Sequence, residues 1–175
     1  VKTGEVLDLL SLEKSGRGRF QARFVHNGGQ VVICGGAVAN SSVDALRALL
    51  QELCHCVNPE QDVLLIARKD PTPELRTLLK EANFARRVQF LLGDVTLEAD
   101  RIRAKLKRAK MIFVMSDPNA TDMDAEDEQN LLRASVILRA HPELPLRLAL
   151  LRPESRTMAL NFGFDNTMAF SINEL

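Results

Sequence analysis

The sequence contains no tryptophan and no tyrosine, so its large aromatic side chains are eight phenylalanines among 175 residues. Proteins that bind single-stranded nucleic acids stack the bases on aromatic side chains, and few such side chains are present here. A net positive charge is lacking as well, since 23 basic residues are balanced by 23 acidic ones. Binding to nucleic-acid phosphates requires a net basic surface. The composition therefore predicts no nucleic-acid partner.

Long apolar runs and paired cysteines are also missing. No run approaches the roughly 20 apolar residues that a membrane-spanning helix needs, so we expect no direct membrane insertion of this chain. The three cysteines, Cys34, Cys54 and Cys56, are an odd number without Cys-x-x-Cys spacing, which is typical of a reducing compartment. At this length one domain buries enough apolar surface to fold without disulfides or structural metals.

From Gln30 onward, short apolar runs alternate with segments of helical periodicity. Strands are predicted at residues 31–34, 63–66, 88–92, 111–115, 146–151 and 167–170, and helices at about 42–54, 73–83, 97–109, 124–140 and 153–161. Most of the strands are apolar on both faces, as expected for a sheet with helices on each side. The pattern predicts an α/β fold: a Rossmann-like, three-layer, open and mainly parallel sheet of about six strands with helices on both faces.

The first 29 residues differ in composition from the rest. An apolar stretch at residues 6–12 leads into a segment rich in glycine and arginine at residues 15–19. We therefore expect residues 1–29 to form a linker and residues 30–175 to form the Rossmann-like lobe.

The first strand-to-helix turn, residues 34–40, is where a Rossmann fold normally binds the pyrophosphate of a dinucleotide. Gly35 matches the first glycine of the motif, but Ala37 and Asn40 replace the other two. After the second strand, Arg68 and Lys69 stand where a carboxylate usually contacts the ribose. We predict a Rossmann-like fold without a dinucleotide. A nucleotide-binding regulatory domain of a potassium transporter, or a dehydrogenase-like enzyme, remains the alternative.

The histidines and cysteines do not form a catalytic pattern. His26, His55 and His141 have no spacing typical of a catalytic triad or a zinc protease. Residues 54–56 read Cys-His-Cys, but adjacent residues do not easily surround one tetrahedral ion, and an ordinary helix end is the favoured interpretation. We predict that the chain is not an enzyme.

The longest predicted helix begins with an acidic segment at residues 116–128. Its carboxylates suit either a hard cation or the capping of the helix N-terminus, and capping is the favoured interpretation. The residues that follow are apolar almost all round the helix, although covering a sheet requires only one apolar stripe. A second stripe indicates a contact between subunits or domains. The candidate interface residues are Leu131, Leu132, Ser135 and Leu138.

Several segments together resemble a known family. Residues 122–133, 141–146 and 151–155, with similar stretches at 31–35 and 91–94, resemble the first RCK domain (regulator of potassium conductance) of the large-conductance Slo potassium channels. The resemblance implies a Rossmann-like domain of a cytoplasmic gating ring in a calcium-activated potassium channel of the plasma membrane. It also implies a homo-oligomer, a dimer as an isolated fragment, that packs through its fourth and fifth helices, and a linker that transmits movement to the pore. The family continues into a crossover helix and a second lobe, so we expect this chain to be a fragment.

The resemblance also implies a site for a divalent cation, Ca²⁺ or Mg²⁺. In the family, an acidic residue opening the second strand and another in the third hold a divalent cation; Asp62 retains the first, whereas Gln89 replaces the second. A separate calcium site uses acidic residues near the end of the first helix, where Glu52 is the carboxylate in this chain. Asp62 and Glu52 are therefore the candidate metal ligands. A structural oligomerisation module that has lost its ligand is a third hypothesis.

Overall fold

The protein is described by a computed structural model at residues 16–24, 28–40, 42–54 and 61–172. Six parallel strands form one sheet in the order β3-β2-β1-β4-β5-β6. The strands are β1 (Val31–Cys34), β2 (Val63–Ala67), β3 (Val88–Leu92), β4 (Met111–Met115), β5 (Leu146–Leu150) and β6 (Ala169–Ser171). The order reverses between β1 and β4, as in a Rossmann fold. The predicted fold class is confirmed.

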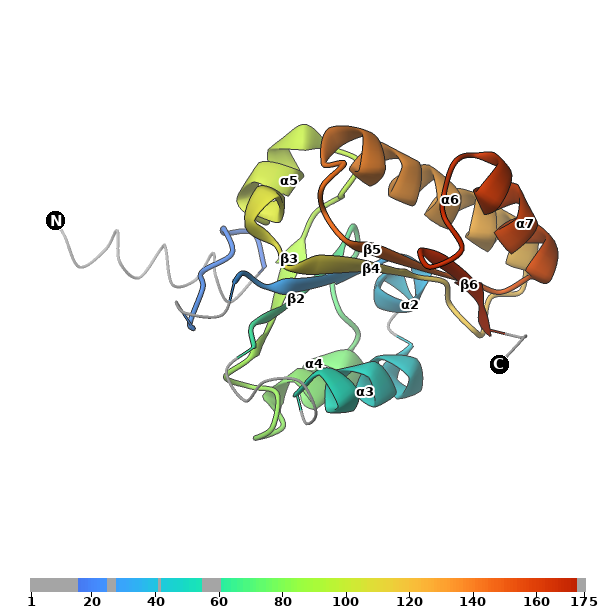
Figure 1. Ribbon diagram of the computed structural model, residues 1–175. Coiled ribbons are helices and arrows are strands. Elements are labelled where there is room, and N and C mark those ends of the chain that lie inside the picture. Colours follow the sequence, from blue (N-terminus) through green and yellow to red (C-terminus); the bar gives the residue numbers. More distant parts are fainter. Residues whose placement is uncertain (1–15, 25–27, 41, 55–60, 173–175) are drawn as a thin grey trace, which may run out of the picture.

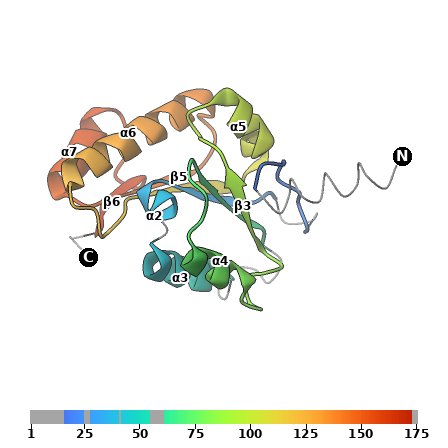
Figure 2. The ribbon, with the colours of Figure 1, turned by 180° about the vertical axis from the view of Figure 1, so that it is seen from behind.

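Helices cover both faces of the sheet, which makes three layers (Figure 1). The helices are α2 (Gly36–Ala39), α3 (Val43–Glu52), α4 (Pro73–Lys80), α5 (Glu98–Arg103), the 3-10 helix η2 (Leu106–Arg108), α6 (Met123–Ala140) and α7 (Pro153–Asn161). The view from behind shows the same division, with α3 and α4 on one face and α5, α6 and α7 on the other (Figure 2).

Each face of the sheet has its own apolar core, because successive strand residues point to opposite sides. On β1, Val32 faces the core beneath α6 and Ile33 faces the core beneath α3 and α4, and both side chains are fully buried. No helix within the described residues is long and apolar enough to cross a membrane.

The predicted helix at 97–109 is in fact two pieces, α5 and η2. Lys105 has a left-handed backbone, with φ of 52°, which ends the helical path. The turn points Leu106 inward, where it is fully buried in the core. Local periodicity does not report such a break, because the apolar spacing continues across it.

Part of the predicted linker, residues 16–24, is fastened to the lobe beside β3. Leu92 N–H donates to the Gly16 carbonyl at 2.8 Å, and the Arg103 guanidinium donates to the Gly18 carbonyl at 2.9 and 3.0 Å. Phe20 is buried in the core beneath α5 and α6. The structure describes nothing of residues 1–15 and 25–27 of the predicted linker.

Candidate functional site

The turn after β1 lies at the carboxyl edge of the sheet, where open α/β sheets bind their ligands. Gly35 has φ of 107°, a conformation that favours glycine. A Cβ atom at Gly35 would overlap the Met115 carbonyl and lie 2.9 Å from Asn130 Oδ1. The turn is therefore closely packed against β4 and α6.

Glu126 of α6 occupies the space in front of the second glycine of this turn. A Cβ atom built on Gly36 would overlap the carboxyl group of Glu126. Glu126 Oε1 accepts hydrogen bonds from Asp117 N–H at 3.1 Å and from Asn130 Nδ2 at 2.8 Å. The chain's own carboxylate therefore lies against the backbone that a dinucleotide phosphate approaches in related folds.

Asp117 connects the end of β4 to the loop before α3. Its carboxylate accepts hydrogen bonds from the Ser42 hydroxyl at 2.6 Å and from Asn40 Nδ2 at 2.9 Å. Burial alone would raise the pKa of Asp117, but hydrogen bonds from Ser42, the Asn119 N–H and Asn40 hold it below its ordinary value. The Ser42 hydroxyl thus bonds Asp117 and forms no side-chain cap to α3.

A cavity of about 310 Å³ lies at this edge and reaches from the turn to the ends of β2 and β3. Arg68 pairs there with Asp94, with 2.5 Å between Arg68 Nε and Asp94 Oδ2. Burial works to raise the pKa of Asp94, but hydrogen bonds from Thr96 and Arg68 keep it below its ordinary value. Burial raises the pKa of the Cys34 thiol to about 12, so Cys34 offers no thiolate to a metal at neutral pH.

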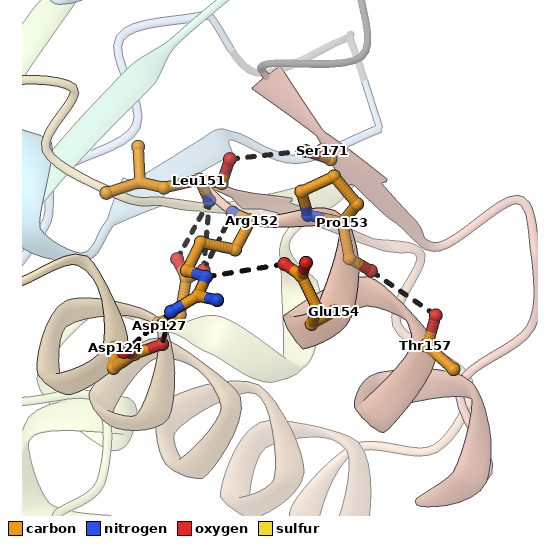
Figure 3. A network of polar contacts seen from close by, with 8 residues as sticks. All are labelled: Asp124, Asp127, Leu151, Arg152, Pro153, Glu154, Thr157 and Ser171. Carbon is orange, nitrogen blue, oxygen red and sulfur yellow. Dashed lines mark hydrogen bonds and ion pairs between the residues drawn. The ribbon is translucent and has the colours of Figure 1, made fainter.

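The acidic residues at the start of α6 form hydrogen bonds within the chain that stabilise the fold. Asp122 caps the helix by accepting from Ala125 N–H at 3.0 Å, as the capping interpretation predicts. Asp127 is 1% exposed and accepts from Leu151 N–H, Arg152 N–H and the Ser116 hydroxyl at 2.9–3.1 Å. These bonds join the start of α6 to the start of α7 (Figure 3).

Arg152 adds an exposed ion pair to the same junction. Its Nη1 contacts both carboxylate oxygens of Asp124 at 2.6 and 2.7 Å, and its Nε lies 3.3 Å from Glu154 Oε2 (Figure 3). At the start of α6, Asp122, Asp124, Glu126 and Asp127 thus have partners within the chain.

The outer face of α6 carries part of the predicted interface. Leu132 is 62% exposed and Ser135 is also exposed, whereas Leu138 is half-buried and packs against the core. Leu131 lies in the chain's own core at 7% exposure, so its side chain faces away from the outer surface.

Helix α7, which lies beside α6, adds two exposed apolar residues that the sequence reasoning missed. Met158 in α7 and Phe162 at its end are 45% and 69% exposed. Their i, i+4 spacing, which places both on one side of a helix, was the available signal. We call Leu132, Met158 and Phe162 the outer apolar face.

The predicted metal ligands lie in different settings. Asp62 is 3% exposed, and its Oδ2 accepts from the backbone N–H groups of Arg23 at 2.9 Å and Phe24 at 3.1 Å. Its Oδ1 is buried without a hydrogen-bond partner among the described residues. The Gln89 side-chain amide donates to the backbone carbonyl of Gln21 at 2.6 Å, in the same segment as Arg23 and Phe24. Glu52 is exposed at the end of α3.

Ca²⁺ and Mg²⁺ take about six or more oxygen ligands, which this arrangement does not provide around Asp62. The described residues contain no group of three or more His, Cys, Asp or Glu side chains able to hold a metal. Metal binding by Asp62 and Glu52 therefore stays a prediction, and their surroundings do not support it.

His141, at the end of α6, is the one histidine within the described residues. Its Nε2 is buried without a described hydrogen-bond partner, and burial together with Arg101 and Lys107 lowers its pKa. His26, His55 and Cys56 lie outside the described residues.

Comparisons with known proteins agree with the fold. A family model described as the calcium-activated potassium channel slowpoke-like RCK domain matches residues 26–148. The chain belongs to this family. The expected RCK resemblance is therefore confirmed. Potassium channel subfamily T member 1 of Mus musculus is 28% identical over 145 residues, which cover 82% of this chain and 12% of that protein. The chain thus spans about an eighth of this relative's length.

Solved structures support the fold of this RCK domain. The human SLO3 gating ring matches with a TM-score of 0.63 and 15% identity, over 83% of this chain and 24% of that one. The GsuK channel bound to NAD matches with a TM-score of 0.51 and 13% identity, over 93% of this chain and 26% of that one. At these identities the likeness concerns the fold alone.

Proposed function

We propose that this RCK domain is a regulatory, non-catalytic part of the cytoplasmic gating ring of a Slo-like potassium channel in the plasma membrane. In this proposal residues 30–175 form the lobe that assembles with other RCK domains, and residues 1–29 connect it to the pore. Membership in the slowpoke-like RCK family supports the channel assignment. The observation that carries the assembly is the outer apolar face of α6 and α7.

The outer apolar face suits a partner of the same kind. Leu132, Met158 and Phe162 are large apolar side chains exposed to water on two helices that lie side by side (Figures 1 and 2). Large apolar side chains exposed on neighbouring helices are typical of a protein contact. Ser135 lies one turn after Leu132 and donates its hydroxyl to the Leu131 carbonyl at 2.8 Å, which satisfies its donor without a partner chain.

The contacts of residues 16–24 support the transmission of force between linker and lobe. Asp62, Gln89 and Arg103 each hold this segment through hydrogen bonds to its backbone. A displacement of the linker would thus pull on β2, β3 and α5 together.

The ligand in this proposal is a divalent cation, Ca²⁺ or Mg²⁺, as the family's description as calcium-activated supports. Because Asp62 Oδ2 is engaged by backbone N–H groups, we favour a cation site elsewhere in the assembled ring. Titration calorimetry of the domain with Ca²⁺ and with Mg²⁺ tests for a site within this chain.

Sedimentation velocity of the 175-residue chain tests the assembly. We expect a concentration-dependent dimer in the parent chain and a monomer in Leu132→Asp and Phe162→Asp. Ile102→Asp is the matched control, because Ile102 is 63% exposed but belongs to α5, which lies at the opposite end of this helical layer from α7 (Figures 1 and 2). A dimer that persists in Leu132→Asp and Phe162→Asp, or that is lost equally in Ile102→Asp, would contradict this interface.

A further inference from the structure

In a Rossmann-like sheet the turn after β1 is left open so that the pyrophosphate of a dinucleotide can approach its backbone. This chain keeps Gly35 and Gly36 at that turn. Both glycines are needed for contacts within the chain: Gly35 faces the Met115 carbonyl and Asn130, and Gly36 faces Glu126.

We infer that the Glu126 carboxylate takes the place of a nucleotide phosphate at the β1–α2 turn. This RCK domain therefore binds no dinucleotide there. The inference goes beyond assembly through the outer apolar face and does not depend on it. Glu126 is then a positioning residue, which ties α6 to the turn.

Glu126 is held in place rather than free to move aside. Its Oε1 accepts from Asn130 Nδ2, and Asn130 is fully buried, with the same Nδ2 2.9 Å from the Ser116 hydroxyl. Asn130 Oδ1 in turn accepts from Arg133 Nη1 at 2.7 Å. A phosphate that displaced Glu126 would remove one acceptor from the Asn130 amide and the acceptor of Asp117 N–H, which is costly for buried groups.

The residue at the ribose position also has a partner within the chain. Arg68, at the end of β2, pairs with Asp94, which is 7% exposed and also accepts from Thr96 N–H at 2.9 Å. A ribose hydroxyl that approached Asp94 would therefore meet a carboxylate that already accepts from Arg68 and Thr96. Glu126 and Arg68, which lie 58 residues apart in sequence, thus both line the cavity at this edge, and each already has partners within the chain.

Thermal unfolding of three variants tests the role of Glu126. Glu126→Ala removes the acceptor of two donors, and we expect the Tm to fall by roughly 4–10 °C. Glu126→Gln keeps a side-chain oxygen at this position, and we expect less than half of that loss. Glu128→Ala, an exposed carboxylate on the same helix, is the matched control and should leave the Tm almost unchanged.

Ligand titration tests the exclusion of nucleotides. Millimolar NAD or NADH should leave the Tm of the parent chain and of Glu128→Ala unchanged. Inorganic pyrophosphate should raise the Tm of Glu126→Ala alone, because only that variant opens the turn. The inference is overturned if NAD stabilises the parent chain, if pyrophosphate fails to stabilise Glu126→Ala, or if Glu126→Ala and Glu128→Ala unfold at the same temperature. These readouts do not depend on oligomeric state, so they can fail while the proposed ring interface stands.

Discussion

The two sides of α6 are built differently. On the inner side of its first turns, Glu126, Asp127 and Asn130 are hydrogen-bonded to the residues that follow β4 and β5, and Glu126 and Asn130 to each other. On the outer side, Leu132 is exposed, and so are Met158 and Phe162 of α7. The polar edge is thus satisfied within the chain, whereas the apolar face is not. This difference supports the two proposals made above, that a partner protein covers α6 and α7 and that Glu126 keeps a dinucleotide from the turn.

The largest expected effect concerns the inner side. Asp127→Ala leaves the N–H groups of Leu151 and Arg152 and the hydroxyl of Ser116 without their acceptor, in a buried place. We expect the free energy of unfolding to fall by about 3–5 kcal/mol. Urea unfolding measures it. The control is Asp124→Ala, one turn away, whose pair with Arg152 is exposed and should cost about 1 kcal/mol or less. Equal losses would contradict the difference between the buried and exposed carboxylates.

Close packing at the turn is tested with two glycines of positive φ. Gly35→Ala both strains the backbone and overlaps the Met115 carbonyl, so we expect a loss of about 3 kcal/mol. Gly163 also has a positive φ, 91°, but an added Cβ would lie in open space. Gly163→Ala should therefore lower the free energy of unfolding by about 1 kcal/mol. Chemical denaturation of both variants measures these losses. Similar losses would mean that backbone strain alone, without close packing, explains the cost of Gly35→Ala.

Through Asp117, the stability of the folded chain should depend on pH. Because its folded pKa lies below the ordinary value of 3.8, its stabilisation is present above pH 3.8 and is lost as the pH falls through the folded value. Asp117→Asn places an amide donor toward the Asn40 amide and should cost about 1–2 kcal/mol at neutral pH. In urea unfolding between neutral pH and pH 2, this cost should shrink as the pH falls below 3.8. A cost that does not change with pH would count against an ionised Asp117.

The smallest effect is expected on the outer side. Leu132→Asp exposes no new apolar surface and should change the free energy of unfolding of the monomer by about 0.5 kcal/mol or less. Denaturation at low protein concentration measures it. A loss comparable to that of Asp127→Ala would show that Leu132 belongs to the core.

The strands and the β/α alternation were predictable, because apolar runs such as 31–34 and 111–115 report burial locally. The contact of Glu126 with Gly36 was not, because the two residues are 90 positions apart and nothing in local periodicity pairs them. The sequence also did not decide which side of α6 faces the core. Its buried face includes the polar residues Asp127 and Asn130, so apolar character alone did not separate the buried Leu131 from the exposed Leu132.

Amide hydrogen exchange of the parent chain, at low and high protein concentration and with or without NAD, compares both regions in one measurement. The account predicts that protection around Leu132 and in α7 rises with protein concentration, while residues 35–40 exchange at the same rate with and without NAD. Protection of residues 35–40 by NAD, with no effect of concentration on α6 and α7, would contradict it.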